Sequence, residues 1–386
     1  MTKFKYQNKS EARNPKQIQN SNDQNPKHRF RLFEFLSFGF VSNFEFRISD
    51  LFCHLCFVIC HLVLLTVFCS SAFAAPIKIR VGHFANITHA QAVIGHANHW
   101  LDENLAPDAV VDWKIFNAGP SAVEALFAGQ LDIAYIGPSP AVNAYVKSEG
   151  EAVRIVAGSS SGGAALVVRA DAGITKPEDF YGKKIASPQL GNTQDVALRS
   201  WLGKQGLKLK EVGGDVQVLP LANADQETLF LKKEIDAAWT VEPWVSTLVL
   251  SNGGKIFLSE SKLWKDGQYA TTVVLVRTKF LEEHPDLVKR FLETHVKLTD
   301  WINTHPEEAK AVFKEEIERE TGREFSQALL NEAWKHVEFT TDPLPATVRA
   351  QALAATKAGF LKKDPDLRFL YDTRLLKEVL ERASKK

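Results

Sequence analysis

The chain has 386 residues, which is enough for two domains of ordinary size. Its hydrophobic share of 45% and charged share of 24% are typical of a globular protein with a buried core. A formal net charge of +1 argues against a nucleic-acid-binding protein, which would carry a basic surplus.

The N-terminal part differs in composition from the rest. Residues 1–31 are rich in Lys, Arg, Asn and Gln, whereas residues 51–69 are almost wholly apolar. Ala72 and Ala74 then give the small-x-small pattern of a secretory cleavage site. We predict an export signal over residues 1–75, with a disordered extension longer than the usual 15–30 residues. The alternative is an uncleaved anchor, because 19 apolar residues nearly span a bilayer.

All four cysteines of the chain lie in this segment: Cys53, Cys56, Cys60 and Cys69. Two histidines between them give the segment a superficial likeness to a metal site. An apolar export segment that happens to use Cys explains the pattern better, and the remainder of the chain has no Cys. Disulfides therefore say nothing about its compartment.

Hydrophobic periodicity predicts alternating strands and helices in the first half of the remaining chain. The expected strands are 77–81, 110–116, 131–136, 153–157 and 164–169. The expected helices are 88–101, one that starts at Pro120 and ends near Gly129, and one from about 140. Ser121 and Glu124 have the spacing of a capping box for the second of these helices.

The alternation of strands and helices continues to about residue 277. A helical turn at 177–180 leads into a strand near 182–186. The following expected elements are a helix at 191–205, a strand at 215–219, a helix at 224–233 capped by Asn223, a strand at 235–239, a helix from Pro243 and a strand at 271–277. From 279 onward the pattern is almost entirely helical, with breaks at Pro285, Pro306, Pro343 and Pro365.

A short pattern occurs twice, at 130–140 and 234–244. Each copy reads as a helix end, a buried strand that opens with Asp132 or Asp236, an aromatic residue near its carboxyl end, and a turn with Pro. The β-α-β-α order predicts an α/β protein with mainly parallel sheets covered by helices. Two related halves suggest two lobes that close on a small molecule.

We divide the chain at this repeat. Lobe 1 is discontinuous and takes residues 76–164 and 274–386, whereas lobe 2 is inserted and takes residues 165–273. The strands 164–169 and 270–277 would form the hinge between the lobes.

Four turns are expected to meet at the cleft, at residues 84–89, 137–140, 191–194 and 239–244. Each turn leads from a strand end to a helix start, where free N–H groups and partial positive charge suit an anion. Ser139 and Thr193 are as readily explained as helix caps. Trp239 is either a core aromatic or a wall of the cleft, and Glu242 either caps a helix or contacts the ligand.

Four histidines, His83, His89, His96 and His99, lie within 17 residues. Three or four converging ligands are needed for a metal, and no Cys or nearby carboxylate pair completes a set. We therefore predict no metal site and place only His89 near an anion. The sequence also lacks the nucleophile elbow, the phosphate-binding loop and the metalloprotease motif, so we predict a protein without catalytic residues.

The turns carry a family resemblance. Residues 81–95, 137–140, 191–199 and 239–244, in this order and spacing, resemble periplasmic substrate-binding proteins of ABC importers for nitrate, sulfonate, taurine and bicarbonate. Residues 176–185 are also similar to the segment through which the chain of these proteins enters the second lobe. Binders of sulfonates and sulfate esters are the nearest, through the turns at 86–90 and 191–195.

The resemblance implies a type II periplasmic-binding-protein fold with a two-strand hinge, no cofactor, and a monomer that works with an ABC permease. It implies a periplasmic location and a sulfonate or sulfate ester as ligand. The ligand-binding residues that it implies are Asn86, Thr88, His89, Ser139, Thr193, Gln194, Trp239 and Glu242. The competing reading is an exported enzyme or sensor of the same fold, such as a protein similar to those of thiamine-pyrimidine synthesis.

Overall fold

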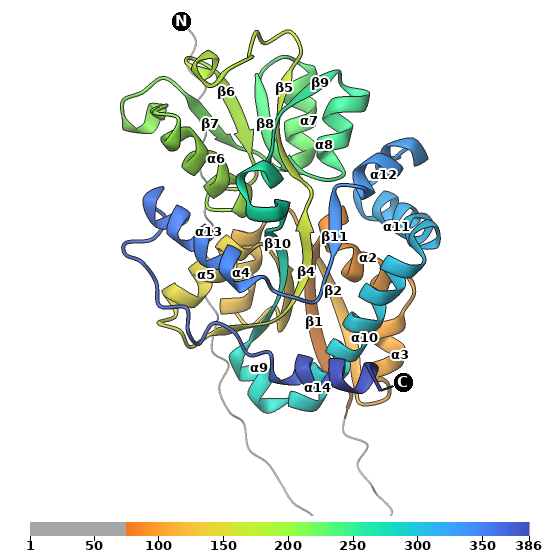
Figure 1. The fold of residues 1–386 in the computed structure, drawn as a ribbon. Helices are drawn as coiled ribbons and strands as arrows, with labels where there is room; N and C mark the ends of the chain where they lie inside the picture. Colours follow the sequence, from red (N-terminus) through yellow and green to blue (C-terminus); the bar gives the residue numbers. More distant parts are fainter. Residues whose placement is uncertain (1–74, 386) are drawn as a thin grey trace, which may run out of the picture. The chain divides into compact units, whose positions relative to one another are not determined.

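A computed structural model of the protein describes residues 75–385. The predicted export signal and its cysteines lie outside the described residues. Within 75–385, no helix combines the length and the apolar character that crossing a membrane requires. The described part contains two β-sheets with helices packed on both faces of each (Figure 1).

The first sheet has the strand order β11-β4-β10-β3-β1-β2. Its strands are β1 (Ile77–Phe84), β2 (Ala109–Phe116), β3 (Ile133–Ile136), β4 (Val153–Gly162), β10 (Ala270–Arg277) and β11 (Val337–Phe339). The strands β1, β2 and β3 are parallel to one another, and β10, β4 and β11 continue the sheet in antiparallel pairs. The sheet is therefore mixed, and not mainly parallel as expected.

The second sheet has the order β7-β6-β8-β5-β9 and the same plan. Its strands are β5 (Ala164–Arg169), β6 (Lys184–Ser187), β7 (Gln217–Pro220), β8 (Ala237–Val241) and β9 (Gly254–Ser259). Here β7, β6 and β8 are parallel, and β5 and β9 are antiparallel additions. The chain passes between the sheets at Gly163, after β4, and again through residues 260–269, before β10.

Long helices cover the sheets and short helical turns connect them. The α-helices are α2 (Ala90–Ala97), α3 (Trp100–Leu105), α4 (Gly119–Phe127), α5 (Pro138–Lys147), α6 (Thr193–Lys204), α7 (Asn223–Leu231), α8 (Trp244–Ser246), α9 (Thr278–Glu283), α10 (Pro285–Thr304), α11 (Pro306–Thr321), α12 (Gln327–Trp334), α13 (Pro345–Lys357) and α14 (Arg374–Ala383). The short turns are η1 (Ile87–His89), η2 (Pro177–Phe180), η3 (Lys210–Val212), η4 (Thr247–Ser251), η5 (Glu260–Leu263) and η6 (Lys265–Gly267).

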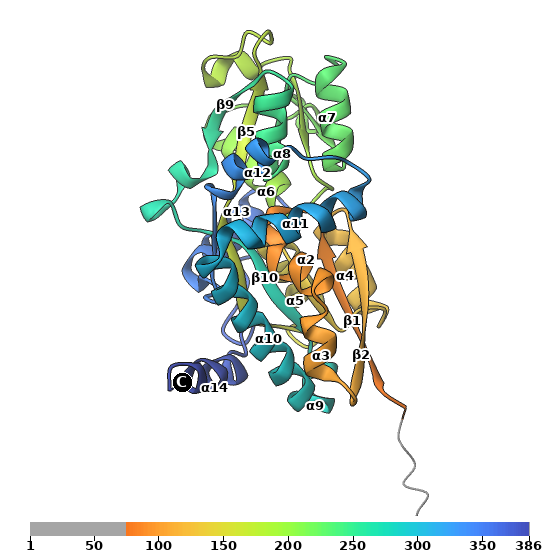
Figure 2. The same ribbon diagram turned by 90° about the vertical axis from the view of Figure 1, so that its right-hand side faces the viewer.

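Side-chain alternation along β3 shows how the core is divided. Ala134 and Ile136 face a cluster with α4, α5 and α13, whereas Ile133 and Tyr135 face the opposite cluster with α3 and α10. Burial on both faces explains why this strand reads as a continuous apolar run. Two further helices, α2 and α11, pack against each other beside the first sheet (Figure 2).

Several predicted boundaries change for identifiable reasons. The expected helix 88–101 breaks before α3 because His99 has a left-handed backbone, at φ 55°. The expected capping box is absent because α4 begins at Gly119, and the Ser121 hydroxyl donates to Gln189 instead, at 2.8 Å. The expected cap Asn223 is the first residue of α7. The sequence analysis missed the short strands β9 and β11.

Proline positions in the C-terminal part follow the prediction more closely. The helices α10 and α11 begin at Pro285 and Pro306. Proline suits the first helical position because its missing N–H would have no intrahelical partner there. The breaks expected at these residues are thus helix starts.

The repeated Asp has the same backbone role in both sheets. Asp132 accepts from the N–H of Arg80 on β1 at 3.0 Å, and its own carbonyl accepts from the N–H of Arg277 on β10 at 2.9 Å. Asp236 does the same with Lys184 on β6 and Arg169 on β5, both at 2.9 Å. Each Asp therefore joins the parallel and the antiparallel neighbour of the central strand.

The two aspartates differ in burial and in the arginine side chains near them. The side chain of Asp132 is fully buried and accepts from the guanidinium groups of Arg80 and Arg277, at 2.7 Å each. Burial raises the pKa of Asp132, but the hydrogen bonds from both arginines outweigh it and hold the pKa below its ordinary value. Asp236 is partly exposed, and Arg169 lies 3.5 Å from it.

We expect Asp132→Asn to lower the free energy of unfolding by about 3 kcal/mol, because it leaves two arginines without their shared counter-charge. Asp236→Asn should cost less, about 1 kcal/mol, because its side chain is partly exposed and lies 3.5 Å from Arg169. Urea unfolding of both variants measures the difference. Equal losses would contradict this account.

Candidate functional site

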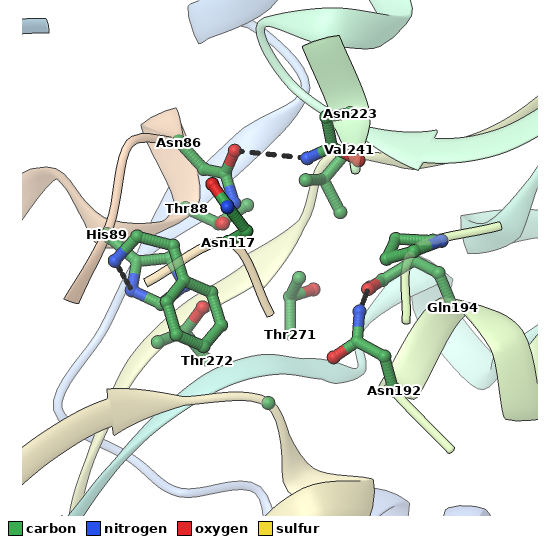
Figure 3. A pocket seen from close by; sticks show the side chains of 13 residues that line it. Asn86, Thr88, His89, Asn117, Asn192, Gln194, Asn223, Val241, Thr271 and Thr272 are labelled. Carbon is green, nitrogen blue, oxygen red and sulfur yellow. Dashed lines mark hydrogen bonds between the residues drawn. The ribbon is translucent and has the colours of Figure 1, made fainter. Parts of the chain in front are cut away.

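A pocket lies between the two sheets, where several strands and helices end. We call it the inter-sheet pocket. It is lined by Phe84, Asn86, Thr88, His89, Asn117, Gly137, Pro188, Asn192, Gln194, Asn223, Val241, Thr271 and Thr272. Figure 3 shows these side chains converging from both sheets. The free space is about 20 Å³, which is room for a water-sized group.

Five helices begin at this pocket. His89, Gly137 and Asn192 are the N-cap residues of α2, α5 and α6. Asn223 is the first residue of α7, and Asn117 lies two residues before α4. A helix start carries a partial positive charge and N–H groups without intrahelical partners. At α5, Pro138 and Pro140 have no N–H and that of Ser139 donates to Thr193, so this helix contributes through its dipole alone. Together, these helix starts favour the binding of an anion.

The side chains add neutral hydrogen-bond donors. Asn86 accepts through Oδ1 from Trp244 at 2.9 Å and from Asn223 at 3.4 Å. Gln194 accepts through Oε1 from Asn192 at 3.0 Å (Figure 3). In each case the amide oxygen is occupied, and no other described residue uses the amide nitrogen, which can donate to a ligand.

His89 is a third neutral donor. Burial lowers its pKa well below the ordinary value, and the charge of His83 acts in the same direction. Its Nδ1 accepts from the N–H of Phe84 at 3.4 Å. A neutral ring that accepts at Nδ1 carries its proton at Nε2 and can donate there.

The two sheets come very close beside the pocket. A methyl group at Gly137 would lie 2.2 Å from Thr193 Oγ1, so only glycine permits this approach. The N–H of Ser139 donates to the same hydroxyl at 3.3 Å, and the N–H of Ile87 donates to the carbonyl of Glu242 at 3.1 Å. Direct contacts thus surround the pocket and leave little free space in it.

The structure brings together half of the residues that the sequence analysis named. Asn86, Thr88, His89 and Gln194 line the inter-sheet pocket. Ser139 and Thr193 instead line a neighbouring pocket with Trp264 and Gln351. The sequence analysis missed five polar residues of the inter-sheet pocket: Asn117, Asn192, Asn223, Thr271 and Thr272. Asn117 directly follows the predicted strand 110–116, and this position at a strand end is a signal that could have identified it.

Trp239 and Glu242 do not line the inter-sheet pocket. Trp239 is fully buried in the core between the second sheet and α6, and its Nε1 donates to Glu260 at 2.9 Å. Tyr135, its counterpart in the repeat, is equally buried and contacts His295 at 3.0 Å. Glu242 accepts from the N–H and hydroxyl of Ser246 and caps the helix that follows.

The chain belongs to the NMT1-like family, whose sequence profile matches residues 74–315. A putative binding protein of Brucella abortus is 32% identical over 247 residues, which are 64% of this chain and 73% of that protein. A putative aliphatic sulfonates-binding protein of Bacillus subtilis is 25% identical over 311 residues, or 80% and 89% of the two chains.

A solved structure confirms the fold class. The alkanesulfonate-binding protein of Xanthomonas axonopodis pv. citri bound to MOPS matches with a TM-score of 0.61 and 19% identity, over 79% of this chain and 98% of that chain. The fold is therefore that of periplasmic binding proteins. By family and fold, the chain is a relative of solute-binding proteins for sulfonates and taurine.

We expect Glu260 to give stability a specific pH dependence. Burial raises its pKa to about 7 from an ordinary 4.5, against the opposing hydrogen bond from Trp239. The folded protein therefore holds this proton more tightly than the unfolded chain. The resulting stabilisation is full below about pH 4.5 and is lost as the pH rises to about 7.

The measurement is the difference in unfolding free energy between wild type and Glu260→Gln, from urea titrations at about pH 5 to about pH 8. We expect the difference to fall with pH by up to about 3 kcal/mol. His295 and His89, held neutral by burial, act in the opposite sense but cancel in this difference. A difference that does not change with pH would refute the assignment.

Proposed function

We propose that this protein is the solute-binding component of an ABC importer and that it captures a small organic anion, a sulfonate or sulfate ester. The observation that carries the proposal is the convergence of five helix starts on one pocket between two sheets. The names of the related binding proteins support the ligand class. We also propose that the protein is exported and that its partner is an ABC permease.

The charge of the pocket supports a monovalent anion. Among its lining residues, all of them described, none is Lys, Arg, Asp or Glu. A sulfonate spreads one negative charge over three acceptor oxygens. Asn86, Gln194 and His89 can donate to them without a buried cation, and the helix starts supply the compensating field. A fixed basic residue is not needed.

We propose that the two lobes open to admit the ligand and close around it. The predicted lobe boundaries and hinge remain part of this proposal. The free space of about 20 Å³ is too small for an organic tail, so the ligand enters only when the sheets move apart. The direct contacts at Gly137 and Glu242 would break during that movement.

A thermal-shift screen tests the ligand class. We expect taurine, an alkanesulfonate or an alkyl sulfate to raise the melting temperature of the purified protein, because a ligand that binds only the native state stabilises it by mass action. Nitrate and bicarbonate should have no effect at the same concentration. A shift with nitrate alone, or with none of these compounds, would contradict the proposed ligand.

Gln194→Ala tests the site itself. We expect it to weaken binding of the best ligand from the screen by roughly 10- to 100-fold, because hydrogen bonds to charged groups contribute about 1.5–3 kcal/mol. Gln205→Ala is the matched control, since Gln205 is an exposed residue at the other end of α6. Calorimetric titration measures both. Equal affinities in the two variants would remove Gln194 from the site.

A further inference from the structure

Three side chains far apart in the sequence meet beside the first sheet. His83 lies on β1, His96 on α2 and Glu320 on α11, and one ligand atom from each lies within 4.8 Å of the others. The side chains of His83 and Glu320 are 0% and 2% exposed, and that of His96 is 24% exposed. The packing of α2 against α11 brings them together (Figure 2).

Hydrogen bonding inside this cluster is incomplete. His83 Nε2 contacts Glu320 Oε1 at 2.6 Å. Within residues 75–385, His83 Nδ1 and the second oxygen of Glu320 are buried without any hydrogen-bond partner. His96 Nδ1 lies 2.8 Å from Glu316 Oε1 and 3.6 Å from Glu320 Oε1, yet it forms no hydrogen bond. Buried polar atoms without partners are uncommon and suggest that a group is missing.

We propose that His83, His96 and Glu320 bind a divalent transition-metal ion of the zinc class. Two imidazoles and a carboxylate are a known ligand set for Zn²⁺. Tetrahedral ligands at zinc distances lie roughly 3.4 Å apart. The Glu320 carboxylate lies 2.6 Å from His83 and 3.6 Å from His96, and His96 lies 2.8 Å from Glu316. Glu316, one helical turn before Glu320, can supply the fourth ligand.

The surroundings suit a bound ion. Trp113 packs against both imidazoles, with ring centroids 5.6 Å from His83 and 5.2 Å from His96, and so excludes water on one side. Glu320 also lines a pocket with Arg323, through which an ion can enter.

A metal here would join three elements that position the inter-sheet pocket. His83 directly precedes Phe84, a lining residue, and His96 lies on α2, whose N-cap residue is His89. The ion would hold α2 and β1 to α11 and so restrict movement of the turn at 84–89. Its role would be to stiffen one wall of the pocket, without contacting the ligand.

Zinc titration of three variants tests the proposal. The variants are His96→Gln, Glu320→Gln and the control His99→Gln, which makes the same change at a histidine 72% exposed and outside the cluster. We expect His96→Gln and Glu320→Gln to lose one Zn²⁺ equivalent or to weaken it more than about 10-fold, the loss that even a supporting group can cause. His99→Gln should bind as wild type does.

The N-terminal cysteines can also bind zinc, and this comparison separates the two sources, because zinc at Cys53 or Cys56 would be unaffected by His96→Gln. Circular dichroism checks that each variant folds. No zinc binding by wild type, or equal binding by all three variants, would overturn the proposal.

X-ray absorption at the zinc edge of the wild-type protein requires no variant. We expect imidazole nitrogen and carboxylate oxygen ligands. Sulfur ligands alone would assign the metal to the N-terminal cysteines and would also overturn the proposal.

Discussion

Both sheets are joined at an aspartate that precedes the central strand, and in the first sheet this carboxylate is buried between two arginines. Asp132 and Asp236 each accept from a parallel neighbour through the side chain and from an antiparallel neighbour through the backbone. A residue that joins both neighbours, one through its side chain and one through its backbone, fixes the register of three strands at one point. At this point each sheet changes from parallel to antiparallel pairing.

The position of the pocket follows from this arrangement. The parallel strands β1, β3 and β8 end on the sides of the sheets that face each other, and a helix begins after each of them. Ligands of open α/β sheets bind beyond the carboxyl ends of strands, because backbone N–H groups and helix fields converge there. The lining of amides, hydroxyls and one neutral imidazole adds donors without fixed charge.

Buried titratable groups occur in both halves of the structure, and their partners determine their charge. Tyr135 and Trp239, equivalent in the repeat, direct their polar ends toward His295 and Glu260. Burial lowers the pKa of His295 to about 4 and raises that of Glu260 to about 7, because in each case it disfavours the charged form. The cluster of His83, His96 and Glu320 differs, because its carboxylate lies 2.6 Å from one imidazole and 3.6 Å from the other.

Local sequence determined the order of strands and helices, the repeat, and the turns that bear Asn86, Thr88, His89 and Gln194. These features depend on periodicity and capping, which act over a few residues. Tertiary structure decided the rest. Trp239 is in the core because the face of β8 that carries it packs on α6, and a run buried on both sides does not reveal which face meets the cleft.

Long-range contacts decided the remaining parts of the site in the same way. Thr271 and Thr272 reach the pocket because β10 returns to the first sheet after more than a hundred residues. Glu320 joins two histidines 237 and 224 positions earlier in the chain only because α11 packs on α2. No local pattern encodes such a meeting, because it arises from the hydrophobic packing of whole elements against one another.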